Sequence, residues 1–128
     1  MARRWMPVLL AAACAAATGC HNTTADPAVY VAVSIAPQPP RVGAATVTVK
    51  LADPSARPLA GARISIEGDM SHPGMEPVFA KASEAEPGTY VAHLQLTMAG
   101  DWVILVQGRL ADGRKIERQT DLRGVLPG

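Results

Sequence analysis

The chain has 128 residues, of which 48% are hydrophobic, 4% aromatic and 18% charged, with a formal net charge of +1. This length indicates one domain, and the scarcity of aromatic residues means that its core must be built from Val, Ile, Leu and Ala. A net charge so close to zero gives no reason to expect nucleic acid or an anionic membrane surface as a partner.

The first twenty residues have the pattern of a bacterial export signal. Arg3 and Arg4 give a positive start, and residues 5–17 are apolar and Ala-rich but too short to span a membrane. The segment ends in Ala-Thr-Gly before Cys20, which resembles a lipoprotein signal with Ala where Leu is usual. We therefore predict a signal peptide at residues 1–19 and a lipid on Cys20, which would hold an exported protein at the cell envelope, facing the periplasm. The alternative is an ordinary signal peptide cleaved nearby.

This interpretation decides what the mature chain contains. Cys14 leaves with the signal, so no free thiol and no disulfide remain, which excludes thiolate metal sites, cysteine nucleophiles and a blue-copper centre. Removing residues 1–19 from the 128 leaves 109 residues, with ten Lys and Arg against eleven Asp and Glu. Residues 20–28 are small and polar and predict a flexible tether. The domain is expected at residues 29–123, followed by a short tail at 124–128.

From residue 29 onward, apolar and β-branched runs alternate with turns rich in Pro, Gly and Asp. Val47, Val49 and Leu51 share one face of a strand, and the unbroken apolar run from Trp102 suits a central strand. The predicted strands are residues 29–35, 45–51, 62–67, 77–83, 89–96, 102–108 and 115–122, separated by turns that include residues 84–88. Seven short strands without a helix predict an all-β, immunoglobulin-like antiparallel sandwich, with a small barrel as the alternative.

One segment between predicted strands combines soft metal ligands with turn residues. Residues 69–77 read Asp-Met-Ser-His-Pro-Gly-Met-Glu-Pro, so Met70, His72 and Met75 lie close together where Pro and Gly oppose regular structure. Thioether sulfur with imidazole suits copper, above all Cu(I), better than any hard cation. We therefore predict a copper site with these three ligands. The other interpretation is that the methionines only fill gaps at the end of the sandwich and that His72 is solvated.

The order of the strands suggests a fourth ligand. In an up-and-down succession, alternate turns lie at the same end, which places Met98, just before an Ala-Gly-Asp turn, near the loop. His93 lies about 16 Å back along its strand, at roughly 3.3 Å per residue, and has the opposite parity to the core-facing residues. We therefore expect Met98 to complete the site and His93 to be the weakest metal candidate.

Four segments together resemble the YtkA-like and FixH-like family of envelope proteins. They are the loop at residues 69–77, Pro-Gly-Thr-Tyr-Val-Ala at 87–92, Leu-Thr-Met-Ala-Gly-Asp-Trp at 96–102 and Arg-Pro-Leu-Ala-Gly-Ala-Arg-Ile at 57–64. The resemblance covers roughly residues 29–122. It implies an immunoglobulin-like sandwich and a link to copper delivery or copper tolerance, including cytochrome oxidase assembly in the FixH-like branch.

These observations favour a lipid-anchored, non-enzymatic copper protein that acts as a chaperone, delivers the metal or sequesters it. Its expected partners are copper, the membrane through the lipid on Cys20, and an envelope copper-handling or oxidase-assembly protein. The alternative is a structural or adaptor module in which the methionine loop is an apolar contact surface. An enzyme is not expected, because no Ser/His/Asp set, paired catalytic carboxylates or phosphate-cradling Gly loop stands out.

Overall fold

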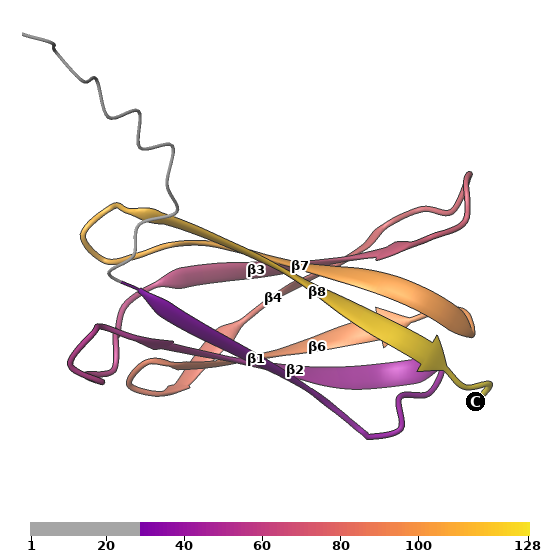
Figure 1. The fold of residues 1–128 in the computed structure, drawn as a ribbon, viewed down its shortest axis with the longest axis horizontal. Coiled ribbons are helices and arrows are strands. Elements are labelled where there is room, and N and C mark those ends of the chain that lie inside the picture. The colour runs from indigo at the N-terminus through magenta and orange to yellow at the C-terminus, as the bar shows by residue number, and fades with distance from the viewer. Residues whose placement is uncertain (1–28) are drawn as a thin grey trace, which may run out of the picture.

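The computed structural model describes residues 29–128, which form two four-stranded antiparallel sheets packed face to face (Figure 1). In chain order the strands are β1 (Tyr30–Ala36), β2 (Gly43–Ala52), β3 (Arg63–Met70), β4 (Val78–Lys81), β5 (Ser83–Glu86), β6 (Thr89–Leu96), β7 (Gly100–Arg109) and β8 (Lys115–Val125). The described residues contain no helix, and so none that could cross a membrane.

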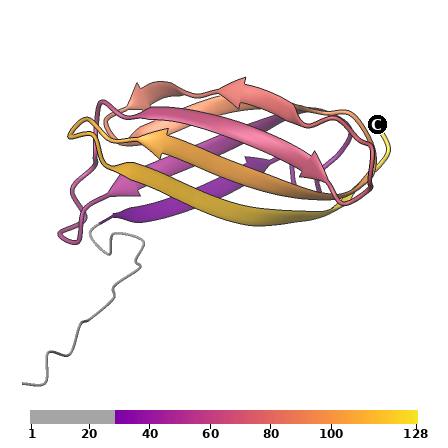
Figure 2. The ribbon, with the colours of Figure 1, turned by 90° about the horizontal axis from the view of Figure 1, so that it is seen from above.

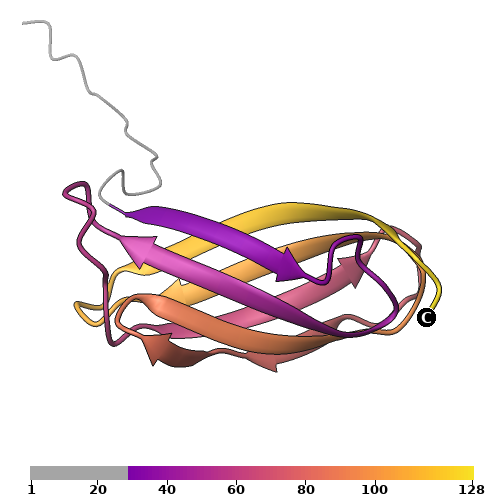
Figure 3. The ribbon, with the colours of Figure 1, turned by 90° about the horizontal axis from the view of Figure 1, so that it is seen from below.

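The strand order within each sheet confirms the predicted immunoglobulin-like sandwich. One sheet has the order β1-β2-β6-β5 and faces the viewer in Figure 3, and the other has the order β4-β3-β7-β8 and faces the viewer in Figure 2. Non-consecutive strands are therefore neighbours in both sheets, as in a Greek-key sandwich. Two separate sheets do not make the closed barrel that was the alternative.

The core lies between the sheets and uses the alternating residues that the sequence indicates. Val47, Val49 and Leu51 on β2 are buried, as is Trp102 on β7. No polar or charged side chain is buried among the described residues. The buried hydrophobic residues are Ile35, Ala45, Val47, Val49, Leu51, Ile64, Ile66, Tyr90, Ala92, Leu94, Leu96, Trp102, Ile104, Val106, Leu110, Leu122 and Val125. A chain that begins at Ala25 contains all of them, so we expect it to fold without the residues that precede it.

The predicted strand at 77–83 and the predicted turn at 84–88 are wrong in detail. β4 pairs with β3, whereas β5 pairs with β6 in the other sheet, and only two residues remain for the turn before β6. The chain changes sheets at Ala82, whose N–H still donates to the carbonyl of Ile64 at 3.0 Å. Because all four residues of β5 are exposed, no alternation marks them as a strand. The sandwich therefore has eight strands where seven were expected.

Two strands also extend further than their sequences indicate. β3 continues to Met70, which pairs with Trp102, and β8 continues to Val125, which pairs with Gly100. Pairing with β7 thus holds both ends extended. The prediction that residues 69–77 are irregular throughout is wrong for the first two, which belong to β3.

A buried tyrosine fastens the loop before β3. The Tyr90 hydroxyl donates to the carbonyl of Leu59 at 2.7 Å and accepts from the N–H of Ala62 at 3.0 Å. Burial raises the pKa of Tyr90 above its ordinary value. Nearby, the N–H of Gly88 donates to the Glu84 carboxylate, which is the main reason that the pKa of Glu84 is lowered.

The sandwich has two ends with different loops. The Met/His end, at the right of Figure 1, carries the loop between β3 and β4, the turn between β6 and β7, and the C-terminal residues. The opposite end, here called the tether end, carries Val29, where the predicted tether joins the domain. It also carries the connections from β2 to β3, β5 to β6 and β7 to β8.

Candidate metal site at the Met/His end

All three methionines of residues 29–128 lie at the Met/His end. Met70 is the last residue of β3, Met75 lies in the loop from residue 71 to residue 77, and Met98 lies in the turn between β6 and β7. His72 lies in the same loop as Met75. The strand order therefore groups Met98 with the three loop candidates, as expected from the parity of the turns. Whether these four residues bind a metal stays a prediction.

The loop is fastened to the start of β7, directly after the turn that carries Met98. The N–H of Ser71 donates to the carbonyl of Asp101 at 3.3 Å, and the Ser71 hydroxyl donates to the same oxygen at 3.2 Å. A Cβ added at Gly100 would lie 3.4 Å from the Met70 Cε, so the terminal methyl of Met70 reaches the start of β7. The φ of Gly100 is +123°, a conformation that favours glycine.

A core residue anchors the same turn. The Trp102 indole is buried, and its Nε1–H donates to the carbonyl of Met98 at 3.0 Å. Because a packed indole has little freedom, this bond fixes the backbone of Met98 relative to the end of the core. The core thus sets the position of the Met98 backbone, whereas the residue as a whole is exposed in part.

The three methionines differ in exposure. Met75 is 36% exposed and Met98 is 44% exposed, and His72 is exposed as well. Met70 is half-buried and packs against the hydrophobic core, so it has a packing role whether or not it binds metal. Met75, Met98 and His72 are therefore exposed residues, whereas Met70 lies at the edge of the core.

His93 lies elsewhere, as its parity and its distance along the strand predict. It is exposed on the outer face of the β1-β2-β6-β5 sheet, opposite Thr46 of β2, and its Nδ1 lies 3.5 Å from the Thr46 Oγ1. Its neighbours Ala92 and Leu94 are buried on the other face. β6 pairs with β2 without a register shift up to Leu96, so no bulge turns His93 toward the Met/His end.

Asp101 holds several segments of the Met/His end together, although its sequence context indicates only a turn. Besides its backbone contacts with Ser71, its Oδ1 accepts from the N–H of Gly124 at 2.9 Å, which ties the turn to the end of β8. The only sequence signal was its place in the Ala-Gly-Asp-Trp segment. A hollow of about 230 Å³ lies beside it, lined by Ser71, Asp101, Trp102, Val103, Asp121 and Arg123.

The donor chemistry of the described residues is narrow. Nowhere in residues 29–128 do three or more His, Cys, Asp or Glu side chains gather so that they could hold a metal ion. The thioether sulfurs at the Met/His end are further metal donors in this part of the chain, and soft sulfur of this kind suits Cu(I).

Fold and site together define an immunoglobulin-like sandwich with a methionine-bearing end. The chain belongs to the YtkA-like family, whose model matches residues 25–107, a range that includes every candidate ligand. Among solved structures, murine CRIg is similar with a TM-score of 0.42 and 11% identity, over 78% of this chain and 98% of that chain. No curated protein matches the chain in sequence.

Proposed function

We propose that this protein is a lipid-anchored copper-binding protein of the cell envelope that carries Cu(I) as cargo, to deliver or to sequester it. The observation that carries the proposal is the gathering of all three methionines of residues 29–128, together with His72, at one end of the sandwich. Exposed methionines at a chain reversal contribute little to packing, so a ligand role explains Met75 and Met98 better than a core role does.

The donors fit Cu(I) better than they fit other ions. Thioether sulfur is soft, uncharged and needs no deprotonation, and one imidazole completes a set that Cu(I) accepts. His72 must be neutral to bind, whereas the three sulfurs bind at any pH, so affinity should fall mildly in acid and persist. Copper is bound and passed on in this proposal, and no reaction is assigned to the protein.

Exposure of the ligands suits transfer. A copper ion held by Met75, Met98 and His72 can be approached from solvent by the ligands of a second protein, so the metal can pass by exchange of one ligand at a time. The recipient would be an envelope copper-handling or oxidase-assembly protein. The proposed lipid on Cys20, which lies outside the described residues, would keep this exchange at the membrane surface.

A second candidate function is an adaptor. The same exposure of Met75 and Met98 gives this end two apolar side chains that a protein partner could cover. The two functions differ in one measurement, because an adaptor needs no metal. A partner that co-purifies with a domain unable to bind copper would favour the adaptor.

The decisive experiment is a competition titration of the domain from Ala25 onward against a Cu(I) chelator. Met98→Leu keeps the volume and removes the sulfur, so we expect Cu(I) affinity to fall about tenfold or more, about 1.4 kcal/mol, with stability nearly unchanged. Met70→Leu should also weaken binding and serves as the positive control. His93→Ala is the matched control on the outer sheet face and should affect binding less.

Two results would contradict the proposal. If wild-type domain fails to compete with the chelator, the Met/His end is not a copper site. If His93→Ala abolishes binding while Met98→Leu changes nothing, the copper lies on the outer face of the sheet and not at the Met/His end.

A further inference from the structure

The charges of the domain are separated along the sandwich, although they cancel in the total. Each charged side chain can be assigned to one end by the half of its strand or by its loop. The tether end has eight Lys and Arg residues and five Asp and Glu residues. The Met/His end has two Lys or Arg residues and five Asp and Glu residues. The tether end holds Lys50, Arg57, Arg63, Lys81, Arg109, Arg114, Lys115 and Arg118 with Asp53, Glu84, Glu86, Asp112 and Glu117. The formal charges are therefore +3 and −3.

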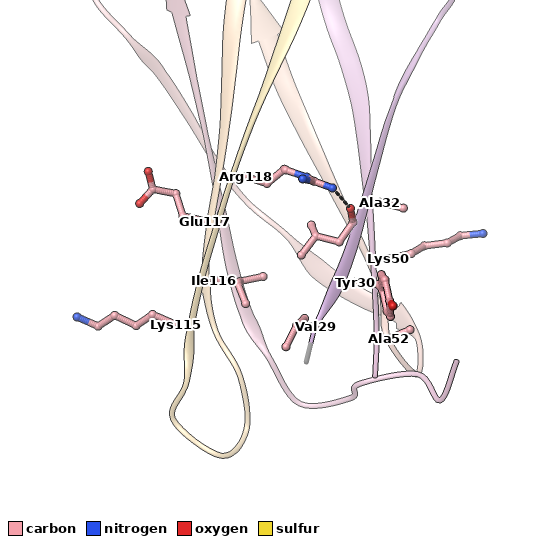
Figure 4. Close-up of a pocket in the computed structure, with 10 residues that line it drawn as sticks. Val29, Tyr30, Ala32, Lys50, Ala52, Lys115, Ile116, Glu117 and Arg118 are labelled. Atoms are coloured by element: carbon pink, nitrogen blue, oxygen red, sulfur yellow. Dashed lines mark hydrogen bonds between the residues drawn. The ribbon is translucent and has the colours of Figure 1, made fainter. Parts of the chain in front are cut away.

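A hollow of about 610 Å³ opens at the tether end between β1 and β8, which are edge strands of different sheets (Figure 4). Val29, Val31 and Ile116 line it and pack against the edge of the core. Arg118 also points into it, and its Nη2 donates to the carbonyl of Val31 at 2.9 Å. The interior of the hollow is thus apolar, with one guanidinium.

The rim of this hollow is mainly cationic and carries an aromatic ring. Lys50 on β2 and Lys115 on β8 extend from opposite sides of it, and Glu117 is the one carboxylate among the lining residues (Figure 4). Tyr30, at the start of β1, is 62% exposed. Tyrosine and lysine around an apolar surface match a membrane interface, where ring and stem reach inward and the charged heads meet headgroup phosphates.

The length of chain before the domain decides which end lies near the membrane. If Cys20 carries lipid, eight residues separate it from Val29, and the nine steps from Cys20 to Val29 can span at most about 32 Å. The tether end is therefore held close to the bilayer. Such tethering makes docking effectively intramolecular, which adds to the affinity that the surface has by itself.

We propose that the tether end docks on an anionic lipid bilayer. Lys50 and Lys115 contact headgroup phosphates, the hollow between β1 and β8 faces the headgroup and acyl boundary, and the acidic Met/His end points away from the membrane. This orientation rests on the lipid anchor of the proposed function and deepens it, because it presents the copper ligands to partners in the surrounding space. The negative Met/His end also attracts cations and basic surfaces.

The test uses vesicles and the copper-free domain from Ala25 onward, which lacks Cys20. The domain is sedimented with vesicles of phosphatidylglycerol mixed with phosphatidylcholine, or of phosphatidylcholine alone, at low and at high NaCl. We expect binding only to the anionic vesicles, and loss of that binding at high salt. Lys50→Gln together with Lys115→Gln should weaken binding about 25-fold, which is about fivefold, or about 1 kcal/mol, for each cation.

The matched control removes the same charge from the other end. Arg41→Gln together with Arg123→Gln should leave vesicle binding essentially unchanged. Equal losses of binding in the two double variants would show that only net charge matters. Failure of the wild-type domain to bind anionic vesicles would indicate a protein partner for the hollow. Equal binding to neutral and anionic vesicles would indicate the same. Any one of these three results overturns the docking surface. A copper titration of the Lys50/Lys115 variant, expected to match wild type, keeps this outcome separate from that of the copper proposal.

Discussion

Trp102 connects the core to the candidate metal site, so its substitution tests both. Its indole is 1% exposed, and its Nε1–H holds the carbonyl of Met98. We expect Trp102→Ala to lower the free energy of unfolding by about 3–5 kcal/mol, the usual cost of emptying a buried aromatic site. Burial gives a similar figure, since about 150–250 Å² of ring at about 25 cal/mol per Å² contributes at most about 4–6 kcal/mol.

Trp102→Phe separates packing from hydrogen bonding. It keeps most of the aromatic volume and removes the Nε1–H donor. The lost hydrogen bond should lower the free energy of unfolding by about 1 kcal/mol. The total loss should be smaller than that of Trp102→Ala. Cu(I) affinity should fall as well, because the turn that carries the Met98 sulfur is no longer fixed to the core.

Urea unfolding followed by far-UV circular dichroism measures both variants. Fluorescence cannot serve, because the only other tryptophan is Trp5, which lies in the predicted signal peptide. The denaturant slope should match that of wild type, so that a shift in midpoint reports stability alone. A loss below about 1 kcal/mol for Trp102→Ala, as for a surface substitution, would refute the central place of the indole in the core.

Three further predictions follow from the fold and the sequence. The domain should show the same β-sheet circular dichroism spectrum with copper removed, because its core is independent of the loop; a disordered copper-free form would refute this. Cys20→Ser should move the full-length protein into the soluble fraction after a high-salt wash, whereas a variant that stays in the membrane and is processed normally would contradict the lipid anchor. Tyr90→Phe should cost about 1–3 kcal/mol, because the carbonyl of Leu59 and the N–H of Ala62 lose their partner. Because the pKa of Tyr90 is raised in the folded state, the hydroxyl contributes fully to stability below the unfolded-state pKa of 10.0. That contribution is lost as pH rises through the folded-state pKa. The stability of Tyr90→Phe should therefore lack this loss at alkaline pH.

The grouping of Met98 with the loop could be predicted although the assumed strand count was wrong. The prediction depended on turn parity, and the chain between β3 and β6 contains one strand more than expected. β4 and β5 follow one another at Ala82 without a chain reversal, and both run antiparallel to their partners β3 and β6. The extra strand therefore adds no turn, and every later turn stays at the end that the parity predicts.

The role of Met70 could not be predicted in the same way. In the sequence it stands between Asp69 and Ser71, three residues before a Pro-Gly pair, and the local pattern assigns it to the loop. In the structure it pairs with Trp102 and packs against the core. A residue more than thirty positions away decides its conformation, and the local pattern carries no information about that contact.

The sequence alone determined the β-sandwich class, the inward face of the strands and the end at which the methionines gather. Each of these follows from period-two burial and from the alternation of turns, which are local properties of the chain. Only the tertiary structure decided that β5 leaves the sheet of β4, that Met70 belongs to β3, and that a nearly neutral domain carries opposite charges at its two ends. These features depend on which distant segments pair through backbone hydrogen bonds, because that pairing decides where each polar residue lies in space.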